Sequence, residues 1–310
     1  MAEPAVFAKG LTKEYTNGKG CHDIHLTLPN GEVFGLLGPN GAGKSTFVKM
    51  LVGLLHKTAG EVKVFGLPPG RPESRRKIGY LPELFRFQDW LTGYEVLQFH
   101  ARLAGVDKSA MHRQVDRVLE LVGLGDRRTE RVRSYSKGMQ QRLGLACALV
   151  GDPQLIILDE PVSALDPGGR HEVRSILTGL RDEGKTVLLN THLLEDVEAV
   201  CSTVGLLSEG KLQAHGRVDD ILHKGREWIF TIGGMEPDLL LQLGQETGVR
   251  FHIESVVDEV TTLVGVIDEP AKLGYVNDVI HRLGMTIYTV SERSGRLENW
   301  FLQLTSTKGH

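Results

Sequence analysis

The chain has 310 residues, of which 41% are hydrophobic and 24% charged, and its formal net charge at pH 7 is −3. This composition is typical of a globular protein with one large and one smaller domain, and the charge gives no reason to expect nucleic acid as a partner. The widely spaced Cys21, Cys147 and Cys201 indicate neither a disulfide framework nor a zinc site, and they favour a reducing compartment. No apolar run approaches the roughly 18 residues of a membrane-spanning helix, so we expect any membrane span to belong to another chain.

The first predicted elements lead into a phosphate-binding loop. The alternating segment 24–28 and the apolar segment 31–37, joined by a Pro-Asn-Gly turn, predict a β-hairpin. The sequence GPNGAGKST at 38–46 follows, fits the pattern G-x-x-x-x-G-K-[ST] and opens an apolar helix. The N–H groups of such a loop converge on phosphates, Lys44 reaches the terminal phosphates, and the Ser45 hydroxyl ligates Mg²⁺. The predicted nucleotide-binding residues of the loop are Gly38, Pro39, Asn40, Gly41, Ala42, Gly43, Lys44, Ser45 and Thr46.

The middle of the chain predicts a second strand pair and a helical region. The two strands lie around 61–64 and 77–80, on either side of a Pro-rich loop. Between 93 and 125, apolar residues recur at i, i+3, i+4 and i+7, which is the spacing of amphipathic helices. We therefore predict a helical subdomain over about 84–150.

A buried parallel sheet is predicted after this region. The apolar strand 155–158 is followed by helix 169–183, strand 186–189, helix 194–199 and strand 204–207. Alternating strands and helices of this kind build a parallel sheet covered on both faces, so the predicted fold class is α/β.

The pattern changes at residue 225. The predicted elements are strand 227–232, helix 238–243, strands 249–257 and 261–267, helix 271–283 and strand 286–290. This β-α-β-β-α-β order predicts a small α+β domain of ferredoxin-like fold at 225–310, closed by a helix at 297–304. Its sequence has no glycine-rich loop, metal-ligand cluster or acid pair, so we expect an accessory or regulatory role.

Two acids end the apolar strand 155–158. Asp159 is placed to hold Mg²⁺, and Glu160 to act as the general base that polarises the attacking water. Alternatively, two acids at a strand end can cap the next helix. A phosphate loop alone leaves kinases, GTPases, helicases and transport ATPases open.

The motifs in their order resemble the nucleotide-binding subunit of an ABC transporter over about 6–216. The segment SYSKGMQQR at 134–142 stands where this family has its LSGGQ-type signature. Ser136 and Gly138 match the family pattern, whereas the residue after each of them departs from it. Such departures resemble the branch of the family that drives exporters with separately encoded membrane subunits.

Three further positions match the family. Asp166 ends a D-loop-like SALD segment, His192 stands at the switch histidine that contacts the γ-phosphate, and Tyr15 matches the aromatic on which adenine stacks. Considered singly, Tyr15 and His192 are more often a core aromatic and a surface histidine. As members of this ordered set, they are predicted site residues.

Glu83 departs from the family, which usually has glutamine at this position of the Q-loop. A carboxylate can still place an oxygen on Mg²⁺, but it adds negative charge beside the phosphates, so we expect a stronger dependence on Mg²⁺. In the family, the following segment 84–91 receives a short helix of the membrane subunit. The alternative is core packing of Phe85, Phe87 and Trp90.

The resemblance implies a P-loop NTPase domain of ABC type at 1–224 that binds ATP and Mg²⁺. It implies a head-to-tail dimer, a homodimer in the simplest case, in which each ATP contacts the phosphate loop of one chain and Ser136 and Gly138 of the other. The expected metal ligands are Ser45, Glu83 and Asp159, and the expected catalytic residues are Lys44, Glu160 and His192.

The function that follows is the ATP-hydrolysing motor of an exporter. We expect integral membrane permease subunits as partners and a peripheral location on the cytoplasmic side of the cell membrane. One alternative is a soluble ABC-type ATPase that acts on ribosomes or DNA, but the single motif set and the lack of a heptad run disfavour it. The other is a nucleotide switch that hydrolyses poorly, which Glu160 and His192 disfavour.

Overall fold

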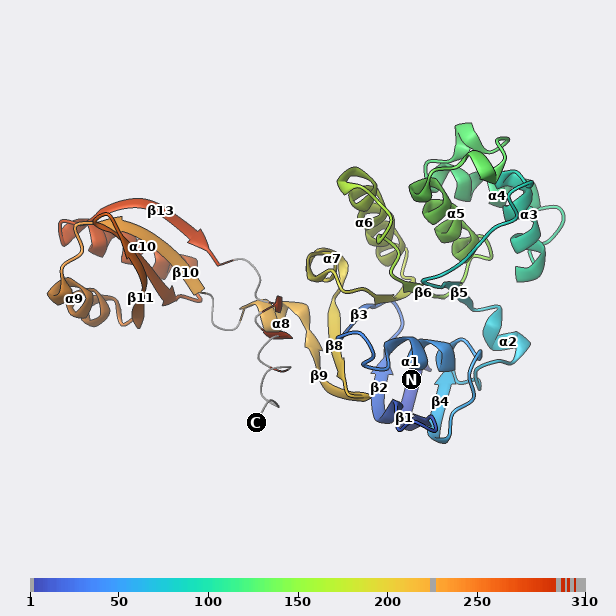
Figure 1. The fold of residues 1–310 in the computed structure, drawn as a ribbon, viewed down its shortest axis with the longest axis horizontal. Coiled ribbons are helices and arrows are strands. Elements are labelled where there is room, and N and C mark those ends of the chain that lie inside the picture. Colours follow the sequence, from blue (N-terminus) through green and yellow to red (C-terminus); the bar gives the residue numbers. More distant parts are fainter. Residues whose placement is uncertain (1–2, 224–226, 294–296, 299, 302–303, 305–310) are drawn as a thin grey trace. The chain divides into compact units, whose positions relative to one another are not determined.

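The computed structural model describes residues 3–223, 227–293, 297–298, 300–301 and 304 (Figure 1). The chain divides into two compact units, and the division lies between Arg217 and Val218. The sequence places the domain boundary after residue 224, which leaves helix α8 (Val218–His223) on the other side of the division. Among the described residues, no helix has the length and apolarity needed to cross a membrane.

The first unit is built on a six-stranded sheet. Its order is β5 (Ile78–Leu81), β6 (Leu155–Asp159), β7 (Thr186–Asn190), β3 (Val33–Leu37), β8 (Thr203–Ser208) and β9 (Lys211–Arg217). The neighbours from β5 to β8 pair in parallel, because helical crossovers join them. Every residue of β3, β6 and β7 is buried, as expected for strands covered on both faces. The parallel sheet is therefore confirmed, and β9 adds an antiparallel edge that the sequence did not predict.

A second, antiparallel sheet shows that both predicted strand pairs are wrong. Its order is β2 (Gly20–Leu28), β1 (Val6–Glu14) and β4 (Ala59–Val64). The segment 24–28 therefore pairs with β1, while 31–37 lies in the other sheet. Likewise, 61–64 pairs with β1, whereas β5 pairs with β6. The two strands join different sheets because their burial differs. The residues of β2 alternate between buried and exposed, so only one face of β2 is covered, whereas both faces of β3 are buried.

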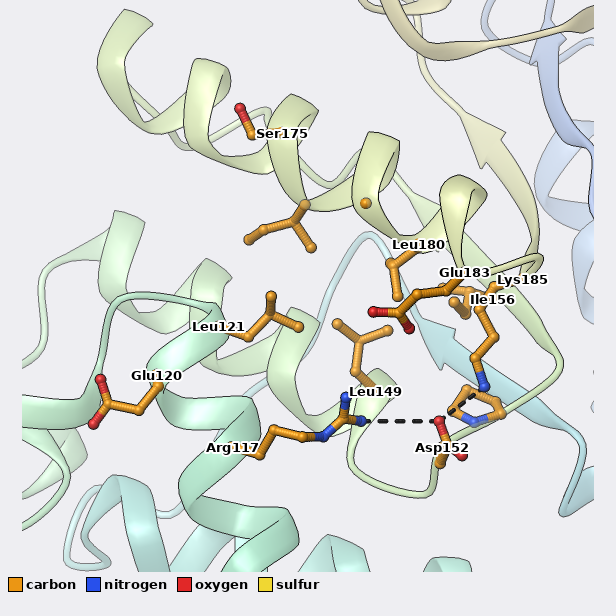
Figure 2. Close-up of a pocket in the computed structure, with 13 residues that line it drawn as sticks. Arg117, Glu120, Leu121, Leu149, Asp152, Ile156, Ser175, Leu180, Glu183 and Lys185 are labelled. Carbon is orange, nitrogen blue, oxygen red and sulfur yellow. Dashed lines mark hydrogen bonds and ion pairs between the residues drawn. The ribbon is translucent and has the colours of Figure 1, made fainter.

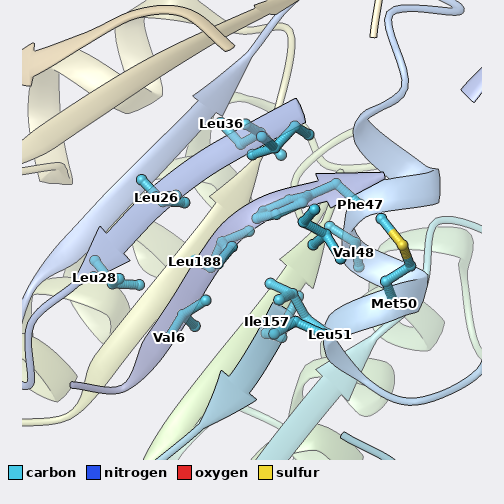
Figure 3. Close-up of a cluster of buried hydrophobic side chains, with 14 of the residues drawn as sticks. Val6, Leu26, Leu28, Leu36, Phe47, Val48, Met50, Leu51, Ile157 and Leu188 are labelled. Atoms are coloured by element: carbon cyan, nitrogen blue, oxygen red, sulfur yellow. The ribbon is translucent and has the colours of Figure 1, made fainter. Parts of the chain in front are cut away.

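The main core lies between these two sheets and the first helix, α1 (Lys44–Leu51). Figure 3 shows Phe47 and Val48 of α1 packed among side chains of both sheets, including Val6, Leu36 and Leu188. All of these side chains are 2% exposed or less. The core therefore fixes the start of α1 against the end of β3, and so fixes the shape of the loop between them.

The other helices of this unit were mostly predicted, but the four-residue helix Pro72–Arg75 was not, because the sequence indicated only a Pro-rich loop between the two strands. They are α2 (Pro72–Arg75), α3 (Gly93–Ala104), α4 (Met111–Leu121), α5 (Lys137–Leu149), α6 (Pro167–Asp182) and α7 (Leu194–Val200). Helix α3 starts at a capping box, in which Thr92 and Glu95 satisfy each other's backbone N–H groups, and ends at Gly105 with a φ of +81°. Helices α3 and α4 confirm the predicted helices between 93 and 125.

The second unit contains the predicted β-α-β-β-α-β order. Its elements are β10 (Glu227–Gly233), α9 (Pro237–Thr247), β11 (Phe251–Val257), β12 (Val260–Val266), α10 (Pro270–Arg282) and β13 (Thr286–Glu292). The sheet order is β11-β12-β10-β13, and all pairs are antiparallel. Phe230, Leu263 and Ile280 are fully buried in the core of this unit. The predicted closing helix, 297–304, lies partly outside the described residues.

Candidate nucleotide site

The phosphate loop joins the end of β3 to the start of α1 and needs glycine at two positions. Gly43 caps α1 with a φ of +104°, and a Cβ there would lie 2.6 Å from the Gly20 carbonyl oxygen. A Cβ at Gly38 would lie 2.1 Å from the Leu207 carbonyl oxygen. The loop runs so close to the neighbouring backbone that no larger residue fits at either position. The free N–H groups of the first turn of α1 then face the loop, an arrangement that binds anions.

Lys44 is held inside the loop. Its side chain is 8% exposed, and its Nζ donates to the carbonyl oxygens of Gly38, at 2.6 Å, and Pro39, at 3.3 Å. Burial lowers the pKa of Lys44, and the nearby carboxylates of Glu160, Asp159 and Glu83 oppose that shift. The ammonium group is thus poorly hydrated and is held by carbonyl oxygens of the loop. A phosphate bound in the loop could accept a hydrogen bond from it.

Asp159 and Asn190 are register partners at the carboxyl ends of β6 and β7. Asp159 is 3% exposed, and its carboxylate accepts a hydrogen bond from Asn190 Nδ2. Burial raises the pKa of Asp159, while this hydrogen bond acts in the opposite direction. Asn190 Oδ1 is buried without a hydrogen-bond partner among the described residues. We did not predict Asn190 as a site residue, although a polar residue that ends an apolar strand is a usable signal.

Glu160 has a strained backbone that several hydrogen bonds hold in place. Its φ is +53°, in the left-handed region, which costs a residue other than glycine about 1–3 kcal/mol. Its N–H donates to the Asn190 carbonyl oxygen at 2.8 Å, and its own carbonyl accepts from Gln141 Nε2 at 3.2 Å and Ser163 Oγ at 3.1 Å. Both carboxylate oxygens of Glu160 lie 2.9 Å from His192 Nδ1. The structure thus brings the predicted general base and the predicted switch histidine together.

A cavity of about 650 Å³ collects most of the predicted nucleotide-binding residues. It is lined by Tyr15, Asn40, Gly41, Ala42, Gly43, Lys44, Ser45, Thr46, Glu83, Asp159 and Glu160, and also by Asn17, Lys19, Gly20 and Asn190, which were not predicted. The ring of Tyr15 is partly exposed, with Lys13 Nζ 5.7 Å from its centre. Of the predicted residues, Gly38, Pro39, Ser136, Gly138, Asp166 and His192 are not part of the lining. Gly38 and Pro39 instead hold Lys44, and His192 contacts Glu160.

The predicted metal ligands fit Mg²⁺. Ser45, Glu83 and Asp159 line the same cavity and offer one hydroxyl and two carboxylates. Mg²⁺ prefers one or two carboxylates and takes its remaining ligands from water and substrate phosphates. The buried carboxylate of Asp159, whose charge is poorly solvated, would gain from a cation.

The signature and D-loop residues meet in a second hollow of about 380 Å³, which we call the signature hollow. Ser136 caps α5 and accepts from the Met139 N–H at 3.2 Å, and Asp166 caps α6 and accepts from the Gly169 N–H at 2.8 Å. Gly138 completes the predicted set. The signature hollow shares no lining residue with the nucleotide cavity. One chain therefore carries two separate groups of predicted ATP-binding residues.

The strand, phosphate loop and helix, together with acids at the end of the adjacent strand, define a nucleoside triphosphatase of the P-loop class. The family model for ABC transporters matches residues 21–163. The bacitracin transport ATP-binding protein BcrA of Enterococcus faecalis is 33% identical, over 100% of this chain and 99% of that protein. The Nod factor export ATP-binding protein I of Rhizobium sp. (strain N33) is 33% identical, over 98% of both chains.

A solved structure has the same fold. It is a dimeric ATP-binding cassette in a post-hydrolysis state with ADP and Pi, with a TM-score of 0.63 and 25% identity, and the match covers 69% of this chain and 98% of that one. The chain belongs to the family of ATP-binding subunits of ABC transporters. It is an ATPase that binds ATP with Mg²⁺ and forms part of a transporter. The alternative of an ATPase that acts on ribosomes or DNA is not supported.

Proposed function

We propose that the chain drives an exporter and works as a head-to-tail homodimer. The observation that carries the dimer is the separation of the nucleotide cavity from the signature hollow within one chain. Two chains related by a two-fold axis would place the signature hollow of each against the phosphate loop of the other and complete two equivalent sites. The dimeric state of the similar cassette supports this assembly, and the name of the Nod factor export relative supports transport out of the cell.

The proposed chemistry assigns each group in the cavity a role. The loop N–H groups and Lys44 bind the β- and γ-phosphates. Ser45, Asp159 and Glu83 would hold Mg²⁺, which would supply positive charge to offset the charge of the phosphate oxygens. Glu160 accepts a proton from the attacking water. His192 lies 2.9 Å from that carboxylate and orients it toward the γ-phosphate.

A surface for the membrane subunit is proposed around the Q-loop. Leu84 is 87% exposed and Trp90 69%, so large apolar side chains of this segment face solvent. Core packing accounts for Phe85, whose ring lies against Gly144 of α5, but not for Trp90. An apolar helix of a permease subunit on the cytoplasmic side of the membrane would cover these side chains.

Photo-crosslinking tests the proposal. The full-length chain carries a photoreactive amino acid at Trp90 or, as a control, at Leu54, which is 65% exposed and lies after α1. We expect illumination of cells to link position 90, but not position 54, to a membrane-spanning protein. A ribosomal protein in the crosslinked product, or equal crosslinking from both positions, would contradict a permease partner.

A further inference from the structure

A third cavity, of about 410 Å³, lies between the helical subdomain and the sheet core. Figure 2 shows its walls, which come from α4, the end of α5, the start of β6 and α6. It shares no lining residue with the nucleotide cavity or the signature hollow. Its volume falls within the range of roughly 300–1,000 Å³ that is typical of small-molecule sites. We call it the interhelical cavity.

The walls of the interhelical cavity are apolar. Figure 2 shows Leu121 and Leu149 on one side and Leu180 on the other, directed toward the space between α4 and α6. Ile176 and Ile156 complete the apolar lining. Leu121 is 40% exposed at the mouth, whereas the other four are 8% exposed or less. Such a surface binds water poorly and favours an apolar ligand.

The rim of the cavity carries one carboxylate without an ion-pair partner among the described residues, that of Glu183. Both of its cations are engaged, since Lys185 Nζ lies 2.8 Å and Arg117 Nη2 3.8 Å from the same Asp152 oxygen (Figure 2). The carboxylate of Glu183 is exposed, points toward the cavity in Figure 2 and forms no ion pair with any described residue, whereas the carboxylate of Glu120 points away from the cavity, toward Gly125. A ligand with a positive charge would therefore find a partner in Glu183, whereas an anion would meet this unpaired carboxylate and two cations that Asp152 already engages.

We propose that the interhelical cavity binds a small amphiphilic cation, that is, an apolar body with one protonated amine, and that its occupancy changes the rate of ATP hydrolysis. The apolar body fills the space between α4 and α6, and the ammonium group lies at the rim near Glu183.

The coupling to hydrolysis follows from two helices that the cavity shares with the signature hollow. Helix α5 begins beside Ser136 and ends at Leu149 in the cavity wall, a length of 13 residues, or about 20 Å. Helix α6 begins at its cap, Asp166, and passes the cavity at Ile176 and Leu180. A ligand that separates the two helices at one end alters the spacing of Ser136 and Asp166 at the other. Binding at the cavity therefore acts on the half of the site that completes the partner's ATP site.

Calorimetric titration with three matched probes tests the proposal. The full-length chain is titrated with n-octylammonium, n-octanol and n-octanoate, which share an alkyl chain and differ in charge. We expect octylammonium to bind most tightly and octanoate most weakly. We also expect Gly179→Leu to weaken binding of octylammonium at least about tenfold, since a Cβ at Gly179 meets no atom within 4 Å and the new side chain fills the cavity.

A second helical glycine provides the control. A Cβ at Gly274 of α10 would also meet no atom within 4 Å, and Gly274 does not line the cavity, so Gly274→Leu should bind octylammonium like the wild type. The variant Glu183→Gln should lose the preference for octylammonium over octanol. It keeps the proposal testable if Gly179→Leu does not fold.

Hydrolysis provides the second readout. Octylammonium should change the rate at saturating ATP in the wild type and in Gly274→Leu, but not in Gly179→Leu. Equal binding by the wild type and a folded Gly179→Leu, or octanoate binding as tightly as octylammonium, would overturn the site. Saturable binding without any change in hydrolysis would overturn its regulatory role. None of these binding results depends on the exporter assignment, which the crosslinking test addresses separately.

Discussion

At the scale of single residues, Glu160 links the strain of the backbone to the chemistry of the site. Its left-handed φ is maintained because Gln141 and Ser163 hold its carbonyl and its N–H is bound to Asn190. Strained residues that their surroundings fix in this way are concentrated at functional sites. The backbone thus holds the carboxylate of Glu160 beside His192 in one position. The side chain does not have to change conformation before it can accept a proton from water.

The first prediction concerns Glu160→Gln. The amide keeps the shape of the side chain but cannot accept the proton, so hydrolysis should fall by about 10²–10⁴ while ATP binding remains. Phosphate release and ATP-induced thermal stabilisation measure the two effects. Glu195→Gln, which changes an exposed carboxylate with 89% side-chain exposure, is the control. Hydrolysis by Glu160→Gln within about threefold of the wild type would rule out the general base.

The second prediction concerns Glu83, the carboxylate that replaces the usual glutamine. It lines the cavity with Ser45 and Asp159, and its charge acts on both Lys44 and Asp159. Glu83→Gln removes a negative charge but keeps an oxygen ligand, so ATP affinity at low Mg²⁺ should rise and the Mg²⁺ concentration for half-maximal hydrolysis should shift. Titration of Mg²⁺ against hydrolysis compares the two proteins. If the curves superimpose, Glu83 does not share in metal binding.

At the scale of secondary-structure elements, two glycines differ in the space available for a side chain. A Cβ at Gly79 of β5 would lie 2.0 Å from the Ala148 carbonyl oxygen of α5, whereas a Cβ at Gly179 of α6 meets open space. The first glycine allows a strand and a helix to approach closely, and the second only weakens its helix.

The third prediction follows from this difference. Gly179→Ala should stabilise the folded state by about 0.8–1.0 kcal/mol, because alanine has the higher helix propensity. Gly79→Ala should lower the melting temperature markedly, because the clash is with backbone that has no room to move. Melting curves of the two variants test both signs. Equal shifts would show that the close approach of β5 and α5 is unimportant.

The fourth prediction concerns pH and helix α3. Burial lowers the pKa of His100, whose ring makes edge contacts with Phe87 and Phe99. As the pH falls below the ordinary value of 6.5, the unfolded chain therefore binds the proton before the folded chain does. The stability that neutral His100 provides is complete above that pH and is lost as the pH falls toward its lowered folded-state pKa. His100→Gln should melt with a weaker pH dependence in this range, and an unchanged dependence would contradict the assignment.

Sequence periodicity predicted the elements of this fold better than it predicted their pairing. Helix α4 was predicted from apolar spacing alone, whereas the hairpin of 24–28 with 31–37 was wrong because local pattern does not specify which sheet a strand joins. Strand β9 has no fully buried residue, so it lacked a usable signal. In the site, the phosphate loop followed from its motif. The contacts of Gln141 and Ser163 with Glu160 arise only from tertiary packing, and sequence spacing could not reveal them.

At the scale of the whole molecule, the predicted ATP-binding residues fall into two groups that one chain does not bring together. The nucleotide cavity contains Lys44 and Asp159, and the separate signature hollow contains Ser136 and Asp166. A monomer with this arrangement can bind ATP through the phosphate loop but lacks the opposing half. ATP would then act as the ligand that favours the closed dimer, and hydrolysis would remove that preference.

The fifth prediction tests this shared site by mixing two inactive proteins. Lys44→Ala disables the phosphate loop but leaves the signature hollow intact, and Ser136→Arg does the reverse. Each homodimer has two defective sites, whereas a mixed dimer pairs the intact loop of one chain with the intact signature of the other. If each site works independently, an equal mixture should regain up to about one quarter of wild-type hydrolysis, because half of the dimers are mixed and each has one good site. Activity that stays absent at every ratio, while the two proteins still form mixed dimers, would show that Ser136 does not complete the partner's ATP site.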